Sequence, residues 1–344
     1  MRKLRVGIVG CGNIFPMHAI SVKKNDNLEL VGVCDVKEDR ANKEADRFNT
    51  KAYFDYDEML KDANLDVVHI CTPHHLHAPM TIKAFKQNIH VLTEKPMAIN
   101  VEDGKAMIEA AKTHKKTLGV IFQNRYNKGA AFLKDTLMQG HLGKIKSAKC
   151  QVTWDRSDAY YQKSDWKGTW DKEGGGAVID QAIHTLDLMR WFVDDEIKSI
   201  DAFIANRVHE TIDVEDTAEG LIQFKNGVRA NFHVINYNTM DSPVTIELHC
   251  EHGIATYTDG LTHIKYNDNA QAIVDADPNE RLDYGDVKSY WGVSHVKQID
   301  AYYYDIMHDR QPVIDGNEAL ITQKIVNGIY QSGKTHTKVE FDKL

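Results

Sequence analysis

The stretch Arg5-Val6-Gly7-Ile8-Val9-Gly10-Cys11-Gly12-Asn13-Ile14-Phe15 decides the fold of the first third of this chain. Its apolar first half predicts a β-strand, and the glycines follow directly where a helix is expected to begin. Gly10 permits a tight turn, and Gly12 lets the backbone approach a pyrophosphate at the helix N-terminus, as in the G-x-G-x-x-G dinucleotide-binding fingerprint. Phe15 replaces the third glycine, which normally serves close packing of the helix on the strand.

Asp35 supports the same prediction from a second strand. It follows the apolar segment Leu28–Cys34 and lies 23 residues after Gly12, close to the ~20-residue offset of an acid that binds the ribose 2′-hydroxyl. Val36 comes next, so no adjacent cation would compensate a 2′-phosphate. We therefore predict NAD as the cofactor, with NADP less favoured. The structural alternative is a simple strand-to-helix turn in which Asp35 only ends the strand.

The periodicity of the chain predicts two domains and an α/β fold class. Short β-rich segments alternate with amphipathic ones up to Phe122, which is typical of a parallel sheet; the expected strands are Arg5–Val9, Leu28–Cys34, Val67–Ile70, Ile89–Thr93 and Leu118–Ile121, and the expected helices Pro16–Lys24, Ala41–Phe48, Ala78–Gln87 and Val101–Thr113. We expect a Rossmann dinucleotide-binding domain over residues 1–122 and an α+β domain for substrate binding and oligomerisation over residues 123–344.

Longer alternating segments in the second domain predict a mostly antiparallel sheet. The expected strands are Ile145–Trp154, Lys198–Asn206, Thr217–Phe224, Val228–Ile235 and Val244–His249, and the expected helices are Ala177–Phe192, Val296–His308 and Glu318–Gln331.

Composition excludes several classes of function. The 344-residue chain has a formal net charge of -8 and no basic stripe, which argues against nucleic-acid binding because that requires clustered cations. No apolar stretch approaches the ~20 residues that span a bilayer. The five cysteines are scattered, odd in number and without a CxxC pair, so we expect reduced thiols and a cytoplasmic protein without membrane partners.

The segment Cys71-Thr72-Pro73-His74-His75-Leu76-His77 follows an expected strand, at the edge of a parallel sheet where ligands bind. We expect it to form a loop that lines the nicotinamide-ribose pocket. Its three histidines admit a metal site, but no carboxylate or cysteine completes a ligand set at the usual spacing. We therefore predict that no metal is bound.

Two further motifs carry groups for hydride transfer from an alcohol, which needs a base for the hydroxyl proton and a group that stabilises the developing alkoxide. Glu94-Lys95-Pro96 ends an expected strand, and Gly174-Gly175-Gly176 precedes a helix on which Asp180 and His184 stand four residues apart and share a face. The alternative for Lys95 is a surface charge, although Glu94 and Pro96 on either side would fix it, and the less favoured alternative for the Asp–His pair is a solvated one. The apolar residues around the pair favour a cleft.

Together these motifs resemble the Gfo/Idh/MocA family of sugar and inositol dehydrogenases, over essentially the whole chain. The motifs are Gly10-Cys11-Gly12-Asn13-Ile14, Thr72-Pro73 with His77, Glu94-Lys95-Pro96, Phe122-Gln123-Asn124-Arg125, and the three glycines with Asp180 and His184.

The resemblance implies a large open sheet in the second domain and a homodimer or homotetramer that buries its open face. It also implies an acid/base role for His184, a lysine at 95 that holds the reacting oxygen or shares the proton transfer, and Asp180 orienting substrate and histidine. It further implies that the cofactor is contacted by residues in loops and at strand ends. These residues are Gly10, Gly12, Asn13, Ile14, Asp35, Thr72, Pro73, His77, Glu94, Lys95 and Gln123.

The expected substrate is a small sugar or cyclic polyol such as an inositol or pyranose, oxidised at a secondary alcohol. Trp154, Arg156 and Trp170 lie in a segment rich in aromatic and charged residues, which suits stacking on a sugar face and hydrogen bonds to its hydroxyls; buried tryptophans of a folded loop are the alternative. Arg125 and Arg156 would also suit the phosphate of a nucleotide-sugar or glycoside 3-dehydrogenase substrate. A non-catalytic sugar sensor that binds dinucleotide is the alternative from another class.

Overall fold

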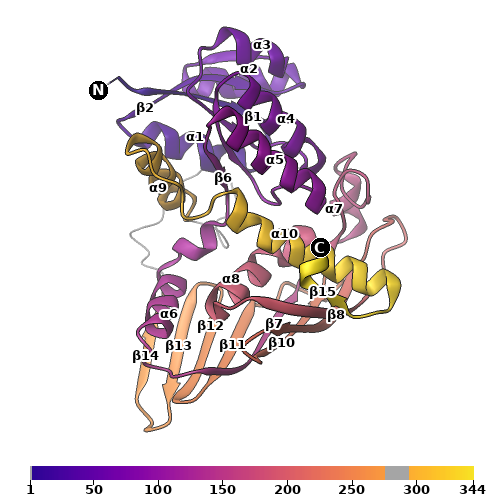
Figure 1. Ribbon diagram of the computed structural model, residues 1–344. Coiled ribbons are helices and arrows are strands. Elements are labelled where there is room, and N and C mark those ends of the chain that lie inside the picture. Colours follow the sequence, from indigo (N-terminus) through magenta and orange to yellow (C-terminus); the bar gives the residue numbers. More distant parts are fainter. Residues whose placement is uncertain (1, 276–293) are drawn as a thin grey trace. The chain divides into compact units, whose positions relative to one another are not determined.

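The computed structural model describes residues 2–275 and 294–344. These residues form two compact units (Figure 1). Residues 2–123 and 294–320 make up the first unit, and residues 124–275 and 321–344 the second. Among the described residues, no helix combines the length and the apolar character needed to cross a membrane.

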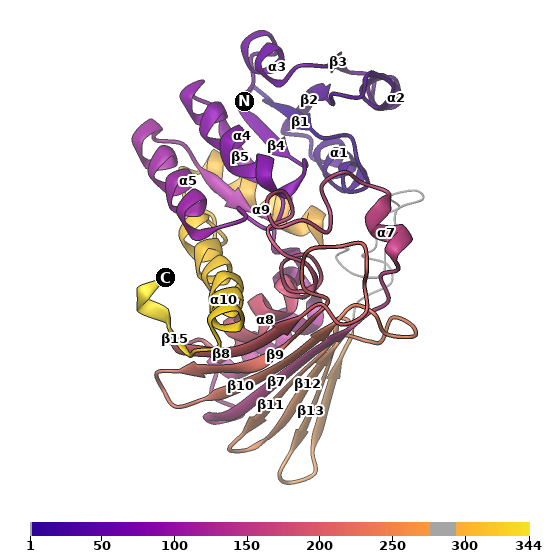
Figure 2. The same ribbon diagram turned by 90° about the vertical axis from the view of Figure 1, so that its right-hand side faces the viewer.

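The first unit is built on a six-stranded, all-parallel sheet with the strand order β3-β2-β1-β4-β5-β6. Helices α4 and α5 pack together, and α1 lies on the opposite side of the sheet (Figure 2). This arrangement confirms the predicted Rossmann fold. Its elements are β1 (Leu4–Val9), α1 (Phe15–Lys24), β2 (Leu28–Cys34), α2 (Glu38–Phe48), β3 (Lys51–Tyr53), α3 (Tyr56–Asp62), β4 (Val67–Ile70), α4 (His74–Lys86), β5 (His90–Thr93), α5 (Val101–His114), β6 (Leu118–Val120) and α9 (His295–Met307).

The second unit carries a nine-stranded sheet with the order β14-β13-β12-β11-β7-β10-β9-β8-β15. All neighbouring strands are antiparallel except β7 and β10, so the predicted mostly antiparallel sheet is confirmed. Its elements are α6 (Lys128–Met138), β7 (Ile145–Thr153), α7 (Asp158–Gln162), a π turn (Val178–Ala182), α8 (Ile183–Val193), β8 (Ile197–Ala205), β9 (Thr217–Phe224), β10 (Arg229–Ile235), β11 (Thr245–Cys250), β12 (Gly253–Thr258), β13 (Leu261–Tyr266), β14 (Gln271–Val274) and β15 (Val339–Glu340). Two elements cross the division, the 3₁₀ turn Gln123–Tyr126 and α10 (Gly316–Thr335).

One face of the nine-stranded sheet is covered by helices, whereas the other is open within this unit (Figures 1 and 2). Helix α8 contacts β7 and β11, and α6 contacts β12, β13 and β14. Side chains alternate along β10: Ala230, Phe232 and Val234 are buried, and Arg229, Asn231 and His233 are not. This period of two is what a sheet with one covered face requires.

The second expected domain was to run without interruption from residue 123 to 344, whereas α9 belongs to the first unit. The reason is its apolar side. Ile299, Tyr302 and Tyr303 join the same hydrophobic core as Phe15 and Ile8, and α9 packs along α1. The helix therefore serves as an additional layer of the Rossmann unit.

Candidate active-site residues

The glycine loop after β1 has the geometry of a dinucleotide cradle. Gly10 has φ +94°, and a Cβ there would lie 2.4 Å from the carbonyl oxygen of Cys71, so the carboxyl ends of β1 and β4 are in contact at this point. Strand order reverses between these two strands, which is where such sheets bind ligands. A Cβ on Gly12 would meet no atom within 4 Å, so the backbone there faces open space.

Phe15 takes over the packing role of the missing third glycine. Its side chain is fully buried in the core of the first unit, and its ring meets the edge of Phe48 on α2 at 5.7 Å between ring centroids. The departure from the fingerprint therefore fills the space beside α1 and leaves the open face of Gly12 unobstructed.

Asp35 stands at the end of β2 and is held in place by two backbone groups. Its Oδ2 accepts a hydrogen bond from the Cys11 amide at 2.9 Å, and its Oδ1 accepts one from the Lys37 amide at 2.9 Å. The first contact ties the carboxylate directly to the glycine loop. Val36, which follows, is exposed.

The expected loop of histidines is wrong in its secondary structure, because α4 begins at His74 directly after Pro73. His77 is buried on this helix, and its two ring nitrogens pair with the carbonyl oxygens of Pro96, at 2.7 Å, and Thr72, at 2.8 Å. The ring thus joins the ends of β4 and β5. These contacts give His77 a structural role and do not support the cofactor contact expected of its side chain.

Glu94 is the centre of a buried hydrogen-bond network that sequence reasoning missed. Its Oε1 pairs with the Nε2 atoms of His18, at 2.9 Å, and His295, at 3.1 Å, and its Oε2 accepts the Lys95 amide at 3.1 Å. Burial alone would raise the pKa of Glu94, but the hydrogen bonds from His18 and His295 hold it well below its ordinary value. These partners fix the position of the carboxylate, and the cofactor contact expected of Glu94 stays a prediction.

The network continues into the core through two more rings. His18 Nδ1 lies 3.0 Å from His69 Nδ1, and His69 Nε2 lies 2.8 Å from the Tyr303 hydroxyl. Within the described part of the chain, only His18, Glu94 and His295 place three ligand-type atoms within 4.8 Å of one another. In this group Glu94 Oε1 is hydrogen-bonded to both histidine rings. No sequence signal pointed to this group, since its members come from α1, β4, the end of β5 and α9.

In the second unit, the three glycines form the turn that starts the helical segment of the proposed catalytic residues. Gly175 has φ +148°, and a Cβ there would lie 2.0 Å from the Tyr330 hydroxyl oxygen. Glu215 accepts the amides of Gly176, at 2.8 Å, and Val178, at 2.9 Å, and also the Tyr330 hydroxyl at 3.0 Å. This carboxylate caps the segment, and burial raises its pKa to about 7.

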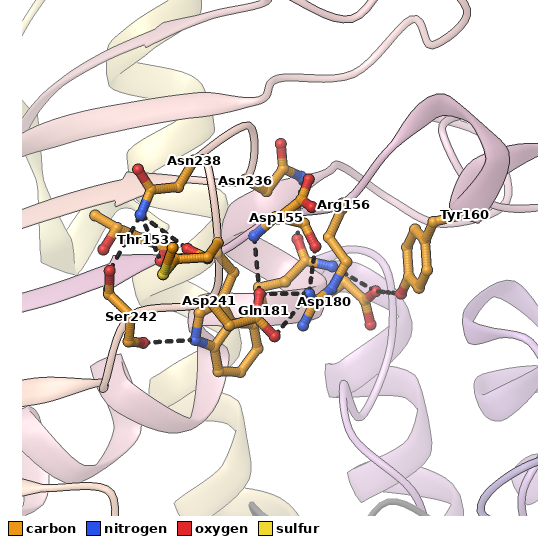
Figure 3. Close-up of polar contacts among 12 residues, drawn as sticks. Thr153, Asp155, Arg156, Tyr160, Asp180, Gln181, Asn236, Asn238, Asp241 and Ser242 are labelled. Carbon is orange, nitrogen blue, oxygen red and sulfur yellow. Dashed lines mark hydrogen bonds and ion pairs between the residues drawn. The ribbon is translucent and has the colours of Figure 1, made fainter.

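Asp180 lies on the π turn and His184 on the first turn of α8, so the single α-helix expected over Ala177–Phe192 is corrected at its start. Asp180 Oδ2 accepts hydrogen bonds from the Tyr160 hydroxyl, at 2.8 Å, and from Gln181 Nε2, at 2.7 Å (Figure 3). Lys167 Nζ is ion-paired with the same oxygen. His184 is buried. The structure therefore brings Asp180 together with Tyr160 and Lys167, two residues that the motif did not include.

Two of the residues expected to bind substrate are engaged at the end of β7. Trp154 is buried and donates from its indole nitrogen to the Ser242 carbonyl oxygen at 3.2 Å. Arg156 Nη1 lies 2.9 Å from Asp241 Oδ1, and its guanidinium stands 4.7 Å above the Trp154 ring (Figure 3). The loop 236–242 and the segment after β7 are thereby fastened to each other.

Trp170 and Arg125 are placed elsewhere in the same unit. The Trp170 indole donates to the Asp213 carbonyl oxygen at 2.8 Å and meets the Tyr330 ring edge at 5.0 Å. Arg125 forms a buried two-point pair with Asp187, at 2.7 and 2.5 Å. A substrate phosphate would have to displace that carboxylate, so the structure does not support Arg125 as its binding group.

The comparisons with known proteins identify the class of protein. Residues 4–122 match the model of the oxidoreductase family with an NAD-binding Rossmann fold, and residues 131–256 match the GFO/IDH/MocA C-terminal domain. The chain belongs to the Gfo/Idh/MocA family of NAD-binding oxidoreductases, as the motifs predicted.

Similar proteins cover the chain to different extents. D-glucoside 3-dehydrogenase of Escherichia coli is 27% identical over 98% of this chain and 97% of its own length. Myo-inositol 2-dehydrogenase of Thermotoga maritima is 30% identical over 65% of this chain and 66% of its own. The crystal structure of the WlbA dehydrogenase from Bordetella pertussis in complex with NADH and UDP-GlcNAcA is 27% identical, with a TM-score of 0.85 over 98% of this chain and 99% of that one.

Proposed function

We propose that this oxidoreductase transfers a hydride between NAD and a secondary alcohol carbon of a sugar or cyclic polyol. The observation that carries the proposal is the glycine-started helical segment with Asp180 and buried His184, in a chain whose other unit carries the dinucleotide cradle. The names of the similar dehydrogenases, which act on a glucoside and on myo-inositol, support the same substrate class.

The cradle residues fit NAD. Open space over Gly12 admits a pyrophosphate at the start of α1, and Asp35 offers carboxylate oxygens at the end of β2 for the ribose hydroxyls. The buried Oε1 of Gln123 has no hydrogen-bond partner among the described residues, so it suits a donor on the cofactor. Because a 2′-phosphate would meet the Asp35 charge, kcat/KM should be higher with NAD than with NADP.

NAD held by the cradle at Gly12 and Asp35 would supply the hydride acceptor for the alcohol carbon. Among the protein's own groups, His184 takes the hydroxyl proton, and loss of this proton together with the hydride converts the alcohol to a carbonyl. The Lys95 ammonium stabilises the charge that develops on the oxygen. Asp180, held by Tyr160 and Lys167, orients a substrate hydroxyl.

Substitution of the proposed base and cation tests this function. His184→Ala and Lys95→Ala should each lower turnover by the ~10²–10⁴ typical of a lost acid–base group while leaving NAD binding measurable by calorimetry. Exposed residues provide matched controls, His141→Ala and Lys43→Ala. Near-normal turnover in both active-site variants would remove the proposed site.

Two further properties belong to the proposal. The open face of the nine-stranded sheet supports a homodimer or homotetramer. The five cysteines are buried free thiols, which supports a cytoplasmic location. A non-catalytic dinucleotide-binding sensor remains the alternative class, and steady NADH formation with any polyol would exclude it.

A further inference from the structure

Three cations among the proposed substrate residues and their neighbours, Arg156, Lys167 and Arg125, are paired with carboxylates of the chain itself. Arg156 Nη1 contacts both oxygens of Asp241, at 2.9 and 3.3 Å. Its side chain is only 12% exposed. The Trp154 and Tyr160 rings lie 4.7 and 5.6 Å from the guanidinium, so the cation is held on three sides.

Lys167 is committed in the same way. Its ammonium group is ion-paired with Asp180 and lies 3.4 Å from Glu173. It also stands 4.8 Å above the Tyr160 ring. Burial lowers the pKa of Lys167, but the combined attraction of Asp180, Tyr160 and Glu173 outweighs it and raises this pKa above its ordinary value. This charge serves to compensate internal carboxylates.

Arg125 completes the set, since its side chain is only 4% exposed and its guanidinium pairs with Asp187 at two points. Asp187 is itself fixed by the Thr322 hydroxyl at 2.7 Å. Withdrawing Lys167 or Arg125 toward a ligand would leave a buried carboxylate without a counter-charge, which is strongly unfavourable. Asp241, whose side chain is 40% exposed, would keep contact with solvent if Arg156 moved away.

The local charge balance points in the same direction. Residues 154–180 contain six carboxyl groups and four cationic side chains. Burial raises the pKa of one of these carboxyl groups, Glu173, to about 8, and Asp241 adds a negative charge beside Arg156. An incoming phosphate would meet this excess of carboxylates. Uncharged hydroxyls, by contrast, can donate to carboxylate oxygens and to the Tyr160 hydroxyl oxygen without breaking an ion pair.

We propose that the substrate is an uncharged sugar or cyclic polyol, and that the enzyme discriminates against phosphorylated and nucleotide-linked sugars. This inference rests on the proposed function and narrows it, because the family includes a solved structure that contains UDP-GlcNAcA. In this chain the arginines that the sequence offered for a phosphate are already engaged by Asp187 and Asp241.

Matched pairs of compounds test the inference. Glucose is compared with glucose 6-phosphate, and methyl glucoside and myo-inositol with UDP-glucose, by NADH formation and by calorimetric binding to the NADH-loaded protein. In each comparison we expect kcat/KM for the neutral compound to be at least ~100-fold higher than for the charged one, equivalent to two tenfold steps of ~1.4 kcal/mol. We expect calorimetry to detect binding of the neutral compounds only. Equal or better kcat/KM or affinity for a charged member overturns the inference.

The binding measurement separates this inference from the proposed function. Selective binding of neutral compounds without NADH formation would refute the proposed reaction and support the charge selection. Binding and turnover of the charged compounds alone would support the proposed reaction and refute the charge selection. Absence of both binding and turnover for every compound refutes both.

The variant Asp241→Asn tests whether the Arg156–Asp241 pair is responsible for the discrimination against charged substrates. It frees Arg156 while conserving the shape of its partner, so the preference for glucose over glucose 6-phosphate should fall by about tenfold or more. Asp342→Asn is the matched control, because it removes one exposed carboxylate of the same unit away from the cluster. An Asp241→Asn preference identical to that of the control would show that this pair does not select the substrate charge.

Discussion

Gly175 is the residue on which the local shape of the proposed site most depends. Its φ of +148° disfavours any side chain, and a Cβ would also collide with Tyr330, the phenol that caps the segment through Glu215. Gly175→Ala should therefore lower the free energy of unfolding more than Gly227→Ala, by ~1–3 kcal/mol, the usual cost of overpacking. Urea unfolding measures this difference.

Gly227 is a fitting control because it has φ +94° while a Cβ there would meet no atom within 4 Å. Gly227→Ala thus reports the cost of the backbone conformation alone. Equal destabilisation by the two variants would mean that Tyr330 moves aside, and that the close approach of the Gly175 backbone has no energetic role.

At this scale the sequence predicted residue types better than their partners. The cradle glycines and Asp35 lie where the fingerprint requires, because their contacts are local in a strand–turn–helix unit. Arg125 and Arg156 were candidates for a phosphate, but their counter-ions Asp187 and Asp241 are 62 and 85 residues away in sequence. No periodic pattern connects such pairs, so a cation that is neutralised by folding looks the same in the sequence as a free one.

The element scale shows a different limit. Strands β2 and β4 and the antiparallel strand β9 have the predicted bounds, because runs of apolar or alternating residues are local signals. The start of α4 and the π turn before α8 were not predicted. Histidine is a neutral helix former, and whether His77 continues a helix depends on the carbonyl oxygens of Thr72 and Pro96, which only the folded sheet supplies.

The buried histidines that link α1 and β4 predict a pH-dependent stability of the first unit. Burial lowers the pKa of His18 and of His69, for His69 well below its ordinary value. Below about pH 6.5 the unfolded chain binds protons that these rings do not bind in the folded protein, so the free energy of unfolding falls as the pH falls. The lowered pKa of Glu94 acts in the same direction at more acidic pH.

His69→Gln should reduce this pH dependence between pH 6.5 and 5.5, by up to ~1.4 kcal/mol per pH unit for one ring. Urea unfolding at several pH values measures the slope. His141→Gln, which changes an exposed ring, should keep the parental slope. If His69→Gln also keeps it, the His69 ring takes up its proton equally in both states and the network does not store this free energy.

On the scale of the whole molecule, the proposed chemistry is divided between the two compact units. The glycine cradle and Lys95 belong to the first, and Asp180 and His184 to the second. Each unit has its own sheet, and the contribution of α9 to the first core shows that the division is not a single cut in the sequence. The predicted boundary lay at the end of β6, where the alternation of strands and helices stops. The helical spacing of apolar residues predicted α9 itself, but it could not predict that this helix packs on the core of the first unit.

The open face of the nine-stranded sheet leads to the prediction on assembly. On β8, the side chains of Ile200 and Ile204 lie close to Gly328 and Gly333 and therefore face α10. Because side chains alternate along a strand, Phe203 points to the opposite, open face of the sheet, where it is 42% exposed. Leu221 of β9 is the cross-strand partner of Asp201 of β8. Asp201 alternates with Ile200 and so lies on the open face, and Leu221 therefore lies on the same open face. Apolar groups on an open sheet face favour association with a second copy.

We expect a dimer or tetramer by light scattering at micromolar concentration, and Leu221→Glu should shift it toward the monomer, because the new carboxylate would be buried without a partner in the interface. Val313→Glu introduces the same charge at an exposed apolar residue of the first unit and should leave the mass unchanged. A monomeric parent protein would contradict the prediction outright. An oligomer unaffected by Leu221→Glu would place the interface elsewhere than on this sheet, and the open face would then require another explanation for its mixture of apolar and charged residues.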